Sequence, residues 1–123
     1  MKTPRIAFVE MFVRELERSR VLYEEILRPL GIEITYMDER VVVFAERFWL
    51  RESSDATENA EIGFTAPTPE AVQDFHRAGV AMGARILEKP TLRSGRFSAA
   101  LEDPDANVIE AVYRLSGDPT ARD

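Results

Sequence analysis

Cysteine is absent from this sequence, and histidine occurs once, as His76. A chain without cysteine can form no disulfide, no thiolate zinc site and no cysteine nucleophile. A single histidine excludes a metal site built from several imidazoles of one chain. No apolar run approaches the roughly 18–20 residues that a transmembrane helix needs. Carboxylates, hydroxyls, arginines and aromatic rings are therefore the groups available for a functional site.

Positive charge is also in the minority, with 16 Lys and Arg against 22 Asp and Glu and a formal net charge of −6. Such a chain repels phosphate backbones and anionic lipid, so we expect neither nucleic acid nor a membrane as a partner. Residues 1–5 lead directly into a strand-like segment without the apolar core of a signal peptide, which predicts a cytoplasmic protein. The length of 123 residues suits one domain with its own core.

The first half of the chain has the pattern of one strand, one helix and three strands. These elements are predicted at residues 5–13, 15–27, 32–36, 41–44 and 47–50. Alternating apolar residues indicate the strands, and an apolar stripe with helical spacing indicates the helix. Pro29 and Gly31 are expected to end that helix. The polar segment 52–59 then reads as a linker.

The second half repeats the same order of elements. They are predicted at residues 61–66, 71–82, 84–88, 96–102 and 107–114, with a loop at 90–95. Thr68 is the expected N-cap of the helix, with Pro69 at its first position. A shift of about 53 residues places Phe8 on Glu61, and the pattern places Trp49 opposite Glu110.

This repeat predicts an α+β fold of two tandem β-α-β-β-β modules, which form curved mixed sheets around a central cavity. We expect a single domain with module one at 5–51, the linker at 52–59, module two at 60–115 and a polar tail at 116–123. One helix covers only one face of each sheet, so the other face is available to line a cleft.

Three stretches resemble the vicinal oxygen chelate superfamily, which includes glyoxalase I, bleomycin- and fosfomycin-resistance proteins and extradiol dioxygenases. They are residues 13–31, residues 61–79 and the final Asp103-Pro-Asp-Ala-Asn-Val-Ile-Glu-Ala-Val, where the superfamily usually has Asp-Pro-Asp-Gly-Asn. The resemblance covers nearly the whole chain and agrees with the repeat. It implies paired modules with a cavity between them.

Metal enzymes of this superfamily take ligands from up to four positions, on the first and fourth strands of each module. The resemblance places Phe8, Trp49, Glu61 and Glu110 at or next to these positions. Phenylalanine and tryptophan cannot ligate, so only two carboxylates remain. We therefore expect no cofactor and no tightly bound transition metal, while a weakly held divalent cation at Glu61 and Glu110 stays open.

Glu61 and Glu110 are the candidate catalytic residues, because two neighbouring carboxylates raise the pKa of one and supply a general acid or base. The alternative is that both are simply hydrated. The candidate ligand-binding residues are Phe8, Glu10, Phe12, Trp49 and Arg93. The aromatic rings suit a flat or cationic ligand, and the alternative is that they fill the cleft.

Two functions fit these residues. One is the binding of a small organic molecule without a transition metal, and the other is a metal-assisted lyase or isomerase of the glyoxalase I type. The missing imidazoles favour the first, and Glu110 keeps the second open. A homodimer is expected because each module has exposed strand edges and an incompletely covered sheet face. The sequence does not choose between modules that pair within one chain and modules exchanged between two.

Overall fold

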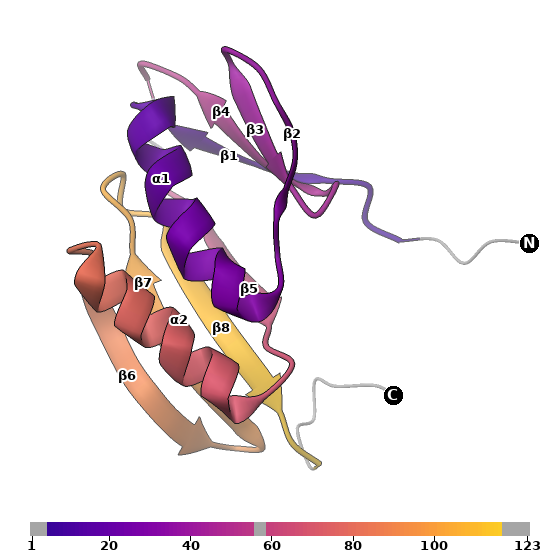
Figure 1. The fold of residues 1–123 in the computed structure, drawn as a ribbon, viewed down its shortest axis with the longest axis vertical. Helices are drawn as coiled ribbons and strands as arrows, with labels where there is room; N and C mark the ends of the chain where they lie inside the picture. Colours follow the sequence, from indigo (N-terminus) through magenta and orange to yellow (C-terminus); the bar gives the residue numbers. More distant parts are fainter. Residues whose placement is uncertain (1–4, 56–58, 117–123) are drawn as a thin grey trace, which may run out of the picture.

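The computed structural model describes residues 5–55 and 59–116, which fold into two mixed four-stranded sheets with one long helix each. Module one contains β1 (Val9–Val13), α1 (Leu16–Leu27), the 3₁₀ helix η1 (Arg28–Leu30), β2 (Ile34–Met37), β3 (Val41–Phe44) and β4 (Phe48–Glu52). Module two contains β5 (Glu61–Thr65), α2 (Pro69–Ala81), β6 (Arg85–Arg93), β7 (Arg96–Glu102) and β8 (Val108–Arg114). The predicted α+β fold of two β-α-β-β-β modules is confirmed (Figure 1).

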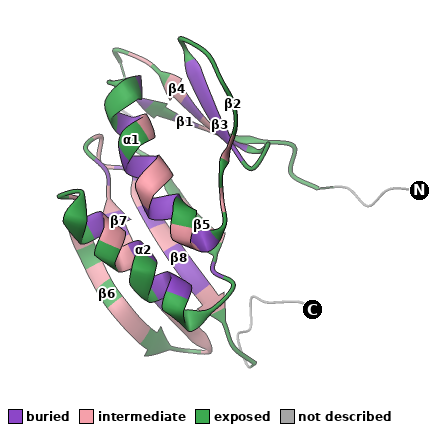
Figure 2. Ribbon diagram, in the orientation of Figure 1, coloured by how far each residue is buried: buried purple, intermediate pink, exposed green. Residues whose placement is uncertain are grey.

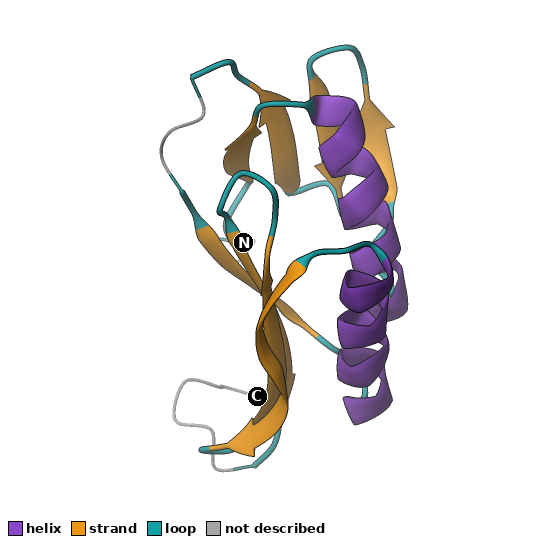
Figure 3. Cartoon of the chain, turned by 90° about the vertical axis from the view of Figure 1, so that its left-hand side faces the viewer, coloured by secondary structure: helices purple, strands orange, loops and turns teal. Residues whose placement is uncertain are grey.

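The two sheets have the same strand order, β1-β4-β3-β2 in module one and β5-β8-β7-β6 in module two. The first and fourth strands of each module pair in parallel, and the other pairs are antiparallel. Both helices lie on one side of the strands, which leaves a helix-free face on each sheet (Figure 3). We call these helix-free surfaces the open faces of module one and module two.

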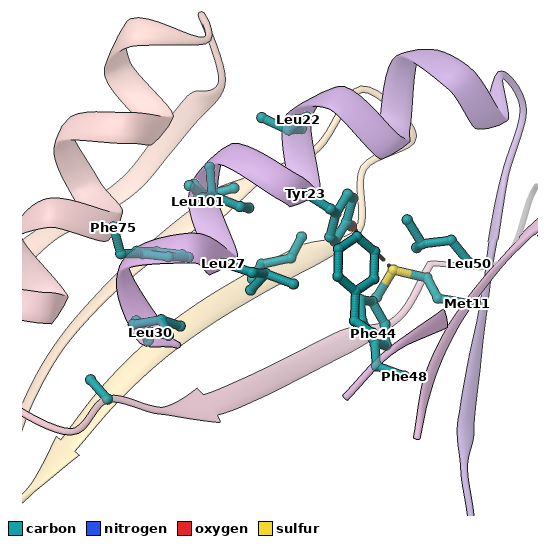
Figure 4. Packing of buried hydrophobic residues seen from close by; sticks show 14 of the residues in the cluster. Met11, Leu22, Tyr23, Leu27, Leu30, Phe44, Phe48, Leu50, Phe75 and Leu101 are labelled. Atoms are coloured by element: carbon teal, nitrogen blue, oxygen red, sulfur yellow. Dashed lines mark hydrogen bonds between the residues drawn. The ribbon is translucent and has the colours of Figure 1, made fainter. Parts of the chain in front are cut away.

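Side-chain alternation explains which residues reach the core. Met11 and Val13 of β1 are buried toward α1, whereas Glu10 and Phe12 point to the open face, as the alternation predicts. The inner side of α1 contributes Tyr23, a fully buried residue, and both helices are buried inward and exposed outward (Figure 2). Figure 4 shows the resulting cluster around Tyr23. No helix in the described ranges is long and apolar enough to cross a membrane.

Contacts in the core and at the turn before β8 join the modules. The Tyr23 hydroxyl of α1 donates a hydrogen bond of 2.7 Å to Oδ2 of Asp103, in the turn before β8. The ring of Phe48 in β4 meets that of Phe64 in β5 edge to face, with centroids 5.2 Å apart. The turn of module two is thus anchored in the core of module one.

The predicted loop at 90–95 is wrong, because β6 continues to Arg93 and only Ser94 and Gly95 form the turn. Pro90 suggested a break since it has no backbone N–H. The strand tolerates it because β6 is an edge strand and its pairing with β7 is irregular between Glu88 and Thr91. The first strand begins at Val9, later than predicted, and β4 extends to Glu52. Part of the predicted linker and most of the predicted tail lie outside the described residues.

We expect Gly79→Ala to destabilise the protein by about 1–2 kcal/mol, because a Cβ at this position of α2 would lie 2.6 Å from Cδ2 of the buried Leu101. Overpacking costs about 1–3 kcal/mol, and the better helix propensity of alanine offsets up to about 1 kcal/mol. Urea unfolding measures the change. Gly63→Ala is the control, since a Cβ at Gly63 meets no atom within 4 Å. Equal stability of the two variants would contradict the close contact.

Candidate functional site

The strand registers of the two modules place Trp49 and Glu110 at equivalent positions. In module one, Glu10 of β1 pairs with Trp49 of β4. In module two, Gly63 of β5 pairs with Glu110 of β8. Each pair joins the first and fourth strands of its module, and the match agrees with the repeat read from the sequence. The same backbone position thus carries an indole in one module and a carboxylate in the other.

Glu61 and Glu110 line one pocket of about 410 Å³ on the open face of module two. Its wall includes Glu61, Gly63 and Thr65 of β5, Glu110, Val112 and Arg114 of β8, and Arg96 of β7. These residues share a face because successive side chains of a strand alternate. The pocket is lined by module two, and the candidates from module one lie elsewhere.

The surroundings of Glu110 raise the pKa of its carboxyl above the usual glutamate value. Burial is the largest cause, because it disfavours the charged form. The positive charge of Arg96 opposes this effect, and the negative charge of Glu61 adds to it. The neighbouring acid therefore contributes, as the sequence suggested, but burial contributes more. A raised pKa moves a carboxyl toward the range in which it can act as a general acid or base.

Arg93 lies at the end of β6 and not in a loop. Its Nη2 donates to Oε2 of Glu88 at 2.6 Å, with Arg93 opposite Arg96 in the register. Its charge lowers the pKa of Glu110, although Arg96 has the larger effect. Arg93 therefore stands beside the pocket that contains the two glutamates.

The aromatic candidates form a separate layer on the open face of module one. The rings of Phe8 and Trp49 are stacked with centroids 4.8 Å apart, and the guanidinium carbon of Arg51 lies 5.9 Å from the Trp49 ring. Nε of Arg51 donates to Oε2 of Glu10 at 2.6 Å. Phe12 lies on the same face of β1 and is 39% exposed. Phe8, Trp49, Arg51 and Glu10 therefore contact one another through ring stacking, a cation–π contact and an ion pair.

Comparison with known proteins identifies the family. No family model and no curated protein match the chain. A solved structure of a glyoxalase/bleomycin resistance protein from Albidiferax ferrireducens T118 is 30% identical, with a TM-score of 0.78, and the match covers 88% of this chain and 98% of that one. This chain belongs to the glyoxalase/bleomycin resistance protein family. The predicted membership of the vicinal oxygen chelate superfamily is confirmed.

Two more distant structures share the glyoxalase/bleomycin resistance fold. Lactoylglutathione lyase from Agrobacterium tumefaciens is 15% identical, with a TM-score of 0.71 and coverage of 91% of this chain and 95% of that one. FosX, a fosfomycin resistance protein of Listeria monocytogenes solved with Mn(II) and sulfate, is 16% identical, with a TM-score of 0.71 and coverage of 95% of both chains. At these identities the likeness concerns the fold alone.

The side chains at the positions that the resemblance matches to metal ligands do not fit a tightly bound transition metal. The resemblance places these positions at Glu61 and Glu110 in module two, which offer carboxylates, and at or next to Phe8 and Trp49 in module one, whose side chains offer no metal ligand. In the described ranges, no three His, Asp or Glu side chains lie close enough to hold an ion together. We therefore derive no step through a metal.

The candidate residues chosen from the sequence did not include Arg96, Arg114 and Thr65, which line the pocket. A signal for two of them was present, because Arg114 and Thr65 follow Glu110 and Glu61 at even spacings along their strands. Even spacing puts side chains on one face. Arg96 required the pairing of β7 with β8, which places it beside Arg114.

Glu110→Gln is expected to raise stability at neutral pH. Because the folded state raises the pKa of Glu110, the stability it contributes is present below the ordinary glutamate pKa and is lost as pH rises through the folded value. Glutamine removes this loss, so the variant should have a higher free energy of unfolding than the wild type between about pH 5 and 8. At pH 4 the two should be equally stable. Urea unfolding across this range measures it. Glu39→Gln, in an exposed turn, is the control, and a gain that is independent of pH would contradict the explanation.

Proposed function

We propose that this chain binds a small organic molecule on the open face of module two, above Gly63 and in contact with Glu110. The supporting observation is the pocket that contains both glutamates, with space above the strand at its centre. A Cβ at Gly63 would meet no atom within 4 Å, and Gly63 pairs directly with Glu110. A ligand can therefore approach the backbone of β5 closely next to the carboxyl.

Binding in this proposal needs no tightly held transition metal, since two carboxylates alone bind such ions weakly. Elemental analysis of protein purified without chelator and then dialysed is expected to find no stoichiometric zinc or nickel. Retention of either ion would mean that other groups, or groups of a second chain, complete a site.

A fragment screen by NMR tests the binding site. Binders are expected to shift the amide signals of 61–65 and 108–114 in the wild type. Gly63→Leu fills the open space, so these shifts should disappear. Lys89→Leu adds the same side chain at an exposed position of β6 outside the pocket, and should leave them unchanged. Binders that map to other surfaces and ignore Gly63→Leu would refute the proposal.

The raised pKa of Glu110 supports a second function at the same pocket, which is proton transfer to and from a bound substrate. Fragments that bind can be incubated with the protein in D₂O. Glu110 would remove a proton from an acidic C–H group of the bound fragment and return a deuteron, so the NMR signal of that C–H group would decay in the presence of the wild type. The decay should be lost in Glu110→Gln while binding persists. Binding without exchange for every fragment would leave the chain as a binding protein.

We also propose that the protein is a homodimer. On the open face of module one, Phe8, Phe12 and Tyr36 are 51%, 39% and 56% exposed, and a partner would cover these rings. Light scattering at micromolar concentration is expected to give twice the chain mass of 14.0 kDa. A mass near 14.0 kDa would exclude the dimer.

A further inference from the structure

We infer that the ligand of the module-two pocket is a small organic anion, whose acidic group is bound at Arg96 and Arg114 and whose other end lies beside Glu110. This inference rests on the function proposed above and adds the ligand class and its orientation. It follows from the distribution of charge along the pocket.

The two ends of the pocket carry opposite charges. Arg96 begins β7 and Arg114 ends β8, and the two are direct partners in the register. Glu110 lies four residues before Arg114 on the same face, and Glu61 begins the neighbouring β5. At about 3.3 Å per residue, the backbone positions of Glu110 and Arg114 are about 13 Å apart. The arginine side chain is long enough to bring its guanidinium group closer to the carboxyl than that. A pocket of about 410 Å³ along this line admits a small molecule with two distinct ends.

The residues between the charged ends are small or apolar. Val112 lies midway between Glu110 and Arg114, is buried with 8% of its surface exposed, and pairs with Thr65. Gly63 leaves open space beside Glu110. The middle of the pocket therefore suits a short carbon skeleton, and the charged residues at the two ends bind the polar groups of the ligand.

Paired arginines favour an oxyanion. Arg96 and Arg114 stand at facing positions of β7 and β8, so both can contribute donors to the same anion. Each guanidinium has five N–H donors in a planar fork, which matches the oxygens of a carboxylate or a phosphonate. Both arginines also interact within the chain. The number of donors allows an arginine to keep such a partner and still bind a ligand.

The acidic end does not exclude an anionic ligand. Glu110 is half-buried and its pKa is raised, so its protonated form can donate a hydrogen bond to the far end of the molecule. Around it, Arg96 and Arg93 offset the charges of Glu61 and Glu88. The site thus combines an anion-binding end with a carboxyl that exchanges a proton.

Titration of labelled protein with three probes tests the inference. Glycolate carries a carboxylate, methylphosphonate carries a phosphonate, and glycolamide is the neutral counterpart of glycolate. We expect at least one anion to bind saturably and to shift the amides of 61–65 and 108–114, with glycolamide at least tenfold weaker. The stronger anion identifies the acid class. Arg96→Gln should weaken that anion at least about tenfold, because charge-assisted hydrogen bonds are lost.

Arg85→Gln is the matched control, since it removes the same charge from an exposed arginine that lines a different pocket and pairs with Glu102. It should bind the anion as the wild type does. Arg114→Gln replaces Arg96→Gln if that variant fails to fold. Binding of glycolamide as tight as that of the stronger anion, or equal weakening of that anion by Arg85→Gln and Arg96→Gln, overturns the anion assignment. If neither anion binds while fragments of the screen still map to Glu110, the inference fails and the proposed function stands.

Discussion

Asp103→Ala is expected to lower the free energy of unfolding by about 3–5 kcal/mol. Oδ1 of this buried carboxylate accepts hydrogen bonds from the backbone N–H groups of Asp105 and Asn107, both at 2.8 Å. Oδ2 accepts from Nδ2 of Asn107 at 3.0 Å and from the hydroxyl of Tyr23 at 2.7 Å. Alanine leaves several buried donors without their acceptor, at about 1–3 kcal/mol for each.

Urea unfolding of three variants separates these contributions. Asp105→Ala is the control for the turn, since Asp105 is half-buried and its Oδ1 accepts one exposed bond, from the backbone N–H of Arg14 at 3.3 Å. We expect it to cost less than about 1 kcal/mol. Tyr23→Phe removes the hydroxyl that donates to Asp103 and leaves the bonds within the turn in place, and it should cost about 1–2 kcal/mol. A loss below about 1 kcal/mol for Asp103→Ala would contradict this account of the turn.

Phe48→Ala should also cost about 3–5 kcal/mol, in the range measured for buried phenylalanines. Phe48 is 3% exposed, and its ring centroid lies 5.6 Å from that of Tyr23 and 5.2 Å from that of Phe64. The substitution therefore opens a cavity where the two modules meet. Scanning calorimetry is expected to show a midpoint lower by on the order of 10–20 °C.

Phe12→Ala is the matched control for Phe48→Ala, because it removes the same side chain from the open face, where Phe12 is 39% exposed. Its effect should be less than half as large. Similar shifts for both variants would mean that the contact at Phe48 contributes little to the core.

Local patterns were sufficient to predict the elements of each module. Alternation identified the first strand and placed Met11 and Glu10 on its opposite faces, and the repeat matched Trp49 with Glu110. The end of β6 was missed because Pro90 reads as a break unless the strand is known to lie at an edge. Whether a strand lies at an edge depends on the strand order of the whole sheet, which the local sequence does not contain.

The site was only partly predictable, for a related reason. Glu61 and Glu110 belong to paired strands of one module, so the pattern could bring them together. The position of Phe8 and Trp49 relative to these acids depends on how one module sits against the other. This arrangement depends on contacts such as that between Tyr23 and Asp103, which no local pattern contains. Arg96 was missed because its place beside Arg114 follows from strand pairing.

The bond between Tyr23 and Asp103 has a consequence for synthesis of the protein. These residues are 80 positions apart in the chain, so α1 leaves the ribosome long before its hydrogen-bond acceptor is made. Until then the Tyr23 hydroxyl lacks its partner from module two, and the core of the first module is incomplete. Contacts between such distant residues form slowly. Nascent chains that end before Asp103 therefore expose apolar surface of the first module, and such surface is what chaperones bind.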